Sequence, residues 1–165
     1  MSLSCRASRL YRFQSTQLAS LARLEPLLQL AARLHVAQVF WSSGLTKVQN
    51  WEGTLFLFQE EYQVPLLPPE LAAWMGTGGE LALPPLLALG LLGRFSALGL
   101  FVVNLVAVLS LAEVPPVALQ QHIQWGGLLA WLAIAGVGRW SLDGWLGARI
   151  RARTSAPDLA RHPST

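Results

Sequence analysis

The stretch LAAWMGTGGELALPPLLALGLLGRFSALGLFVVNLVAVLSLA, from Leu71 to Ala112, decides the fold class of this 165-residue chain. It consists of two apolar runs, residues 71–92 and 95–112, which are separated only by a Gly-Arg pair. The first run carries one formal charge, Glu80, and the second carries none. Because about 20 helical residues cross the roughly 30 Å hydrocarbon layer of a membrane, the two runs predict a transmembrane hairpin.

Two less apolar segments flank this hairpin. Residues 27–46 contain Arg33, His35 and Gln38, and residues 119–138 carry no formal charge. The polar groups of the first segment can be hidden only against other helices. The sequence therefore predicts an all-α fold, a four-helix transmembrane bundle with spans at about 27–46, 71–92, 95–112 and 119–138.

The composition favours a membrane protein. Hydrophobic residues make up 53% of the chain and charged residues 13%, whereas a typical soluble domain has about 25% charged residues. The single cysteine, Cys5, excludes an internal disulfide and a cysteine-based zinc site. The basic residues lie next to the apolar spans, where they fix topology and meet anionic lipid, so we expect no nucleic-acid partner.

The distribution of charges predicts the orientation. Ten of the twelve Lys and Arg residues precede the first span, lie in the second loop or follow the fourth span. The first and third loops instead hold Lys47 and the five glutamates Glu52, Glu60, Glu61, Glu70 and Glu113. By the positive-inside rule, both termini are cytoplasmic and the acidic loops face out.

The whole chain divides into three parts. We expect residues 1–26 to form a basic, weakly amphipathic segment, residues 27–146 to form the membrane domain, and residues 147–165 to form a basic, disordered cytoplasmic tail. In the first loop, Trp51, Leu55 and Phe58 recur at helical spacing. They predict a short helix lying on the outer surface of the membrane.

Polar side chains from three spans fall at similar depth. At a rise of 1.5 Å per residue from the cytoplasmic end, Gln38 lies about 16 Å deep, Glu80 about 18 Å and Asn104 about 15 Å. His35 shares the polar stripe of Gln38, which gives Glu80 candidate partners. Arg33, on nearly the opposite face, reaches either Glu80 or the cytoplasmic headgroups. This layer is either a structural clamp or a ligand or proton site, and both interpretations stay open.

Two further features accompany the polar layer. Pro84 and Pro85 follow Glu80 by one turn and free two backbone carbonyls, so the helix should kink there. His35 and His122 lie near opposite ends of their spans without a third suitable ligand. We therefore expect both histidines to form ordinary hydrogen bonds, and we expect no metal site.

Several short motifs, taken in order, resemble the DoxX family of small bacterial membrane proteins. They run from Arg33 to Asp143 and comprise Arg33-Leu34, the segments FWSSGLTK (40–47) and VPLLPP (64–69), Glu80-Leu81 with Pro84, GLLGR (90–94), GVG (136–138) and SLD (141–143). The resemblance implies a four-helix bundle in the cytoplasmic (inner) membrane. Family members are linked to oxidoreductase systems, one of them as a subunit of a thiosulfate:quinone oxidoreductase and others alongside thiol-redox or oxidative-stress partners.

The sequence itself contains no thiol pair, haem motif or nucleotide site, so it predicts no complete redox site in this chain. Our leading hypothesis is a non-catalytic accessory subunit that anchors a redox partner or serves quinone to it. Glu80, Gln38 and Asn104 would shape the polar site, and no cofactor would be bound covalently. A proton-coupled or small-solute transporter that titrates Glu80 is one alternative, and a structural scaffold is another.

Overall fold

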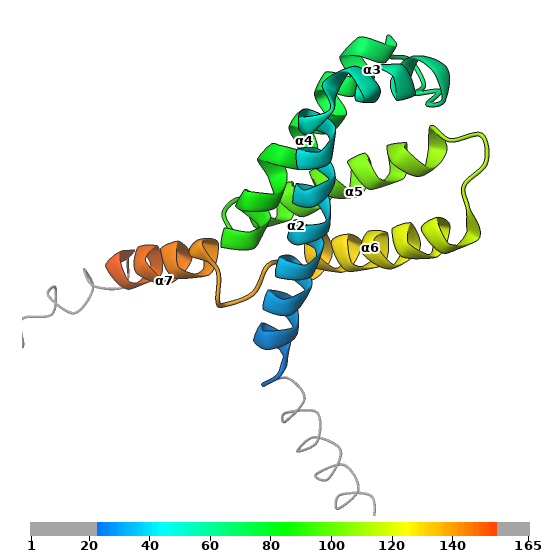
Figure 1. Cartoon of the computed structure of the whole chain (residues 1–165). Helices are drawn as coiled ribbons and strands as arrows, with labels where there is room; N and C mark the ends of the chain where they lie inside the picture. The colour runs from blue at the N-terminus through cyan, green and yellow to red at the C-terminus, as the bar shows by residue number, and fades with distance from the viewer. Residues whose placement is uncertain (1–22, 155–165) are drawn as a thin grey trace, which may run out of the picture.

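The computed structural model describes residues 23–154, and these residues fold into helices (Figure 1). Apart from an isolated bridge between Tyr62 and Leu111, they contain no β-structure. The expected all-α fold class is therefore confirmed. The helices are α2 (Glu25–Gln49), α3 (Trp51–Glu60), α4 (Pro69–Leu89), α5 (Gly93–Leu109), α6 (Pro116–Ala135) and α7 (Leu142–Thr154).

Prolines begin three of these helices, and glycines follow the ends of α4 and α6. Helices α2, α4 and α6 each have a proline in the first helical positions, where the missing N–H group costs nothing. Helix α4 ends at Gly90, which adopts the left-handed conformation. The hairpin turn therefore lies at residues 90–92, slightly earlier than the predicted Gly-Arg pair, which instead begins α5.

Helix α6 begins and ends three residues earlier than the predicted fourth span. The sequence predicts that this span continues to residue 138, but α6 ends at Ala135. Gly136 and Gly138 have φ angles of 95° and 85°, which lie outside the helical region. The segment that follows, up to α7, is therefore a connection.

The helices surround one core. Helix α2 packs along α4, α4 packs against α5, and α5 lies beside α6 (Figure 1). All four contribute fully buried side chains to the core: Val36 and Phe40 from α2, Leu87 from α4, Ala97 and Leu100 from α5, and Leu129 and Leu132 from α6. A smaller cluster joins Phe58 of α3 to Ala72 and Ala73 of α4. The short helix predicted in the first loop is thus present as α3, packed on α4.

Each predicted span coincides with one of these helices, but the crossing of a membrane is a separate question. Within residues 23–154, no helix is both long enough and apolar enough to cross a membrane. The transmembrane character of the bundle and the orientation of its termini therefore stay predictions.

The beginning of the expected disordered tail is helical. Helix α7 continues to Thr154, so the prediction of disorder from residue 147 is wrong for residues 147–154. Ser141 explains the helix, because its Oγ atom accepts a hydrogen bond from the Gly144 N–H at 3.0 Å and so caps the first turn. The rest of the predicted tail, and the amphipathic segment expected before residue 23, lie outside the described residues.

Candidate functional site

A buried ion pair joins α2 to α4. The Lys47 Nζ atom lies 2.7 Å from Glu80 Oε1 and 2.5 Å from Oε2, and it also donates to Ser43 Oγ at 3.0 Å. The Glu80 side chain is 8% exposed and that of Lys47 is 22% exposed. Such a pair balances a carboxylate that would be costly to bury alone.

Gly44 brings the two helices together at this point. A Cβ atom at position 44 would lie only 2.9 Å from the Leu81 side chain and 3.1 Å from Glu80 Cβ. Only a glycine therefore lets the backbone of α2 approach α4 closely enough for Lys47, one turn later, to reach the carboxylate.

The partner of Glu80 is thus not the one that the sequence predicted. Gln38 and His35 are both exposed, and neither forms a hydrogen bond to Glu80 in the part of the chain that the structure describes. Gln38 instead lines a shallow groove of about 240 Å³ together with Trp41, Pro84 and Pro85. Helix α4 remains helical through both prolines, and a kink there stays a prediction.

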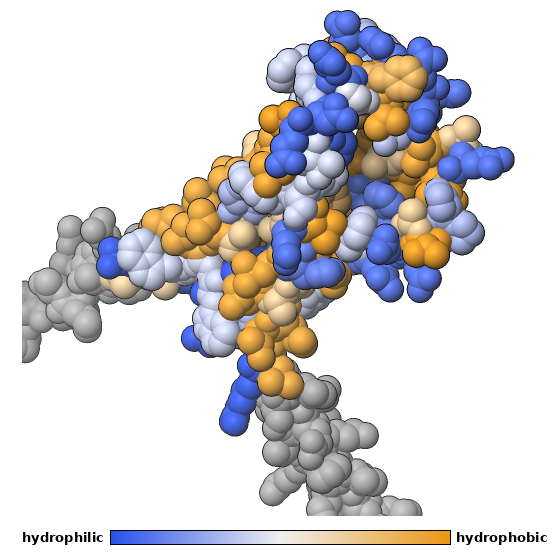
Figure 2. Space-filling model, viewed as in Figure 1, coloured by the Kyte–Doolittle hydropathy of each residue, from blue (hydrophilic) through white to orange (hydrophobic). Residues whose placement is uncertain are grey.

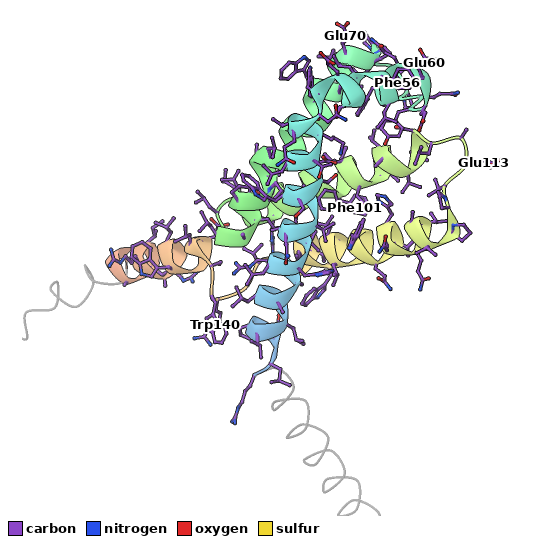
Figure 3. All side chains as sticks on the ribbon, in the orientation of Figure 1. Phe56, Glu60, Glu70, Phe101, Glu113 and Trp140 are labelled. Carbon is purple, nitrogen blue, oxygen red and sulfur yellow. The ribbon has the colours of Figure 1, made fainter. Side chains whose placement is uncertain are left out.

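Arg33 does not pair with Glu80. Its side chain is 1% exposed, and its Nη2 atom donates to the backbone carbonyl of Trp140 at 2.7 Å. Arg33 therefore fastens the connection between α6 and α7 to α2, as Figure 3 shows by the position of Trp140 beside α2. The expected contact with Glu80 is wrong, and contact with headgroups stays a prediction.

Asn104 of α5 pairs with His122 of α6. Asn104 Oδ1 lies 2.8 Å from His122 Nδ1, and Asn104 Nδ2 donates to the His122 backbone carbonyl at 3.0 Å. Trp125 meets the imidazole edge to face, with ring centroids 5.1 Å apart. The ordinary hydrogen bonding that the sequence predicts for His122 is confirmed, although Asn104 lies in a pair of its own and not with Glu80 and Gln38.

This pair lines a groove between α5 and α6. The groove has a volume of about 300 Å³, and its other walls are apolar, formed by Phe101, Leu105, Val108, Leu119, Ile123, Gly126, Gly127 and Ala130. Gly126 keeps the groove open, because a Cβ atom there would lie 3.1 Å from Asn104 Nδ2. An amide and an imidazole among apolar walls suit a flat, amphipathic ligand with hydrogen-bonding oxygens.

Tyr62 lies between α3 and α4, within electrostatic range of Glu80. Its ring meets Phe58 edge to face, with centroids 5.0 Å apart. Burial raises the pKa of the Tyr62 phenol above its ordinary value, and the charges of Glu61 and Glu80 raise it further. A phenol that stays neutral therefore stands near the ion pair.

The polar residues thus form separate pairs. No group of three or more His, Cys, Asp or Glu side chains that could hold a metal ion occurs within residues 23–154. Sequence reasoning missed Lys47 as the partner of Glu80 because it placed Lys47 in the loop beyond the first span. The close approach at Gly44, one turn before Lys47, is the signal that could have found it.

The family model described as DoxX matches residues 28–113. The match contains Arg33, Lys47, Glu80 and Asn104, whereas His122 and the segment 136–143 lie outside it. No curated protein and no solved structure matches the chain. The part of the resemblance that rests on residues 136–143 therefore stays a prediction.

Proposed function

Because the chain belongs to the DoxX family, we propose that it is a membrane-embedded bundle that presents a quinone site to a redox partner protein in the bacterial cytoplasmic membrane. One observation carries the quinone part of this proposal: the Asn104 and His122 pair in the apolar groove between α5 and α6. Surface character and charge distribution support the membrane location.

Helix α5 has its apolar side chains on the outside. Phe95, Leu98, Val102, Leu105 and Leu109 recur at helical spacing and are each 45% to 65% exposed. The buried face of the same helix contains the polar residues Ser96 and Asn104. A helix in water shows the opposite arrangement, so this pattern supports lipid around α5.

The polar residues of the other helices support the same location. Arg33, the Lys47 and Glu80 pair, and the Asn104 and His122 pair make the individual helices less apolar, but each group is bonded between elements of the bundle. Exposed apolar side chains also lie on α4 and on the first half of α2, where Figure 2 shows hydrophobic patches between more polar residues. A bundle can therefore meet lipid with an apolar surface although its helices contain charges.

The two ends of the bundle differ in charge. Glu60, Glu70 and Glu113 lie toward the end formed by α3 and the loop between α5 and α6, away from Trp140 (Figure 3). Arg94 begins α5 at the opposite end, and Arg139 precedes Trp140. This separation supports the orientation with the arginine-rich end in the cytoplasm.

The groove chemistry suits a quinone. Reduction of a quinone to a quinol takes up two electrons and two protons, and the quinol presents O–H donors. His122 Nδ1–H donates to Asn104 Oδ1, so Nε2 of the neutral imidazole is an acceptor, and no hydrogen bond to Nε2 occurs within the described residues. Nε2 can therefore accept a hydrogen bond from a quinol O–H and exchange a proton with it. The electrons would come from the partner protein.

A binding experiment tests the quinone site. The full-length chain would be placed in lipid nanodiscs and titrated anaerobically with decylubiquinol, with quenching of tryptophan fluorescence as the readout, because Trp125 contacts His122. We expect saturable quenching in the parent. We expect His122→Phe, which keeps a ring against Trp125, to weaken binding about tenfold through loss of one hydrogen bond.

His35→Phe is the matched control, because His35 is exposed on α2 and lines neither groove. It should leave quinol binding unchanged. Absence of saturable binding in the parent, or equal binding by the His122 and His35 variants, would contradict the quinone site. Release of the chain from membranes by alkaline carbonate would separately contradict the membrane location.

The two other functions use the Lys47 and Glu80 pair. A proton-coupled transporter would titrate Glu80, whereas a scaffold would need the pair only to fix α2 against α4. The two hydrogen bonds between Lys47 and Glu80 favour the scaffold as the second candidate. Glu80→Gln in proteoliposomes separates these functions: changed solute uptake supports transport, and lower stability without any uptake in the parent supports the scaffold.

A further inference from the structure

Arg33 is the most anomalous side chain of the bundle. It is 1% exposed, yet only its Nη2 atom has an acceptor, the Trp140 carbonyl. Its Nε and Nη1 atoms are buried without a hydrogen-bond partner. A buried guanidinium with unused N–H groups is costly, and such groups are normally satisfied by an anion or by ordered water.

No carboxylate within residues 23–154 offsets this charge, since none has an oxygen within 4 Å of Arg33. Asp143, in the segment after Trp140, accepts from the Leu92 N–H at 3.1 Å and the Gly93 N–H at 2.8 Å, and so caps α5. Among the described residues, the buried guanidinium therefore has no counterion.

Other arginines surround the same connection. We define the basic end as Arg33, Arg94 and Arg139 around residues 136–141. The Arg94 Nε and Nη2 atoms lie 3.5 and 3.7 Å from the position of a Cβ at Gly136. Arg94 and Arg139 are exposed, Arg94 close to Gly136 and Arg139 next to Trp140 in the chain, and we call these two arginines the rim of the basic end.

We propose that the basic end binds a phosphate-type oxyanion, with Arg33 Nε or Nη1 as its buried donor and Arg94 and Arg139 as its rim. The free N–H bonds of Nε and Nη1 point in different directions, so one phosphate oxygen accepts from one of them and the other oxygens remain for the exposed arginines. Guanidinium groups are also the preferred protein groups for binding phosphate.

The connection between α6 and α7 controls access to this site. Residues 136–141 cover Arg33, and Arg33 Nη1 lies close against Gly90, so close that a Cβ atom there would overlap it. Gly136 and Gly138 have positive φ angles, which glycine adopts without strain. Because Arg33 is only 1% exposed, the proposed binding requires this connection to move away from Nε or Nη1.

The phosphate has two sources, a lipid headgroup or a soluble phosphate, and the experiment separates them. The full-length chain would be studied in phosphatidylcholine nanodiscs with added inorganic phosphate, and in nanodiscs that also contain phosphatidylglycerol. Thermal stability and native mass spectrometry would report binding. The lipid source rests on the membrane location proposed above, whereas the inorganic-phosphate source does not.

Binding through Arg33 predicts a rise in Tm in one of these arms, compared with chloride at the same ionic strength. Retention of one phosphatidylglycerol per chain identifies the lipid source. A response to inorganic phosphate alone identifies the soluble source. Arg33→Lys keeps the charge but loses N–H donors, so the apparent Kd should weaken roughly tenfold.

Two variants keep the proposal testable if Arg33→Lys does not fold. Arg94→Gln changes only the exposed rim and should weaken the apparent Kd about two- to fivefold. Arg149→Gln is the matched control, because the Arg149 guanidinium lies over Trp145 of α7, 3.9 Å from the ring centroid. It should leave binding unchanged. A parent that responds in neither arm, or an Arg149→Gln variant that loses as much as Arg94→Gln, would overturn the proposal.

Discussion

The Lys47 and Glu80 ion pair allows a quantitative test of the packing between α2 and α4. Removal of one member of a buried ion pair typically costs about 3–5 kcal/mol, because the other charge is left without a partner. The two members are not equally buried, since Glu80 is 8% exposed and Lys47 is 22% exposed. The two single substitutions should therefore differ in their effect on the free energy of unfolding.

Lys47→Met leaves the more deeply buried carboxylate alone, so we expect a loss of about 3–5 kcal/mol. Glu80→Met leaves a lysine whose long, partly exposed side chain can turn toward water, so we expect about 1–3 kcal/mol. The double substitution removes both charges and should lie within about 1 kcal/mol of the parent. The coupling energy is the sum of the two single losses minus the loss in the double variant, so we expect about 3–8 kcal/mol.

Denaturant titration in mild detergent, followed by tryptophan fluorescence, would give the four free energies of unfolding. Glu113→Gln is the matched control, because Glu113 is an exposed carboxylate in the loop between α5 and α6. It should change stability by less than about 0.5 kcal/mol. Additive effects of the two single substitutions would refute the reasoning, because they would mean that the pair contributes no coupling.

Three further predictions follow from local geometry. Gly44→Ala should destabilise the chain by about 1–3 kcal/mol, because the new Cβ atom would lie 2.9 Å from the Leu81 side chain. Gly127→Ala is the control and should not destabilise the chain, because its Cβ atom would have no atom within 4 Å. Thermal unfolding compares the two variants. The Tyr62 pKa is raised in the folded state, so the contribution of Tyr62 to stability is complete below the ordinary tyrosine pKa and is lost as pH rises through the raised value. When the free energy of unfolding is measured over this pH range, Tyr62→Phe should remove the alkaline loss of stability. Tyr11→Phe, measured in the same pH series, should not remove it. Asp143→Ala should lower the free energy of unfolding by about 1–2 kcal/mol in a denaturant titration, because it leaves the Leu92 and Gly93 N–H groups at the start of α5 without their acceptor. A decrease below about 0.3 kcal/mol would contradict the capping role of Asp143.

The helices themselves could be predicted because their signals are local. Apolar runs long enough for helices, prolines at residues 26, 69 and 116 and glycines at residues 90 and 136 define where the elements begin and end. The two helix ends that lie at glycines were each predicted three residues too late. Gly90 and Gly136 end their helices earlier than the apolar runs do, because hydropathy alone does not report a positive φ angle.

The candidate site was predicted less well, because partners across a bundle depend on rotation and close approach. Depth along a span placed Gln38, Glu80 and Asn104 in one layer, but depth does not state which way a side chain points. Gln38 faces outward, Glu80 meets Lys47, and Asn104 meets His122. A glycine at position 44 and a buried connection over Arg33 decide these pairings, and both are properties of packed helices.

The sequence by itself determined the helical fold class, the approximate position of each helix and the family to which the chain belongs, because these rest on local composition and on the order of short motifs. Only the tertiary structure decided that Lys47 neutralises Glu80, that His122 completes the pair with Asn104, and that Arg33 is buried with unused donors. The physical reason is that a polar side chain must find its partner where helices meet, and that meeting point depends on residues far apart in the chain.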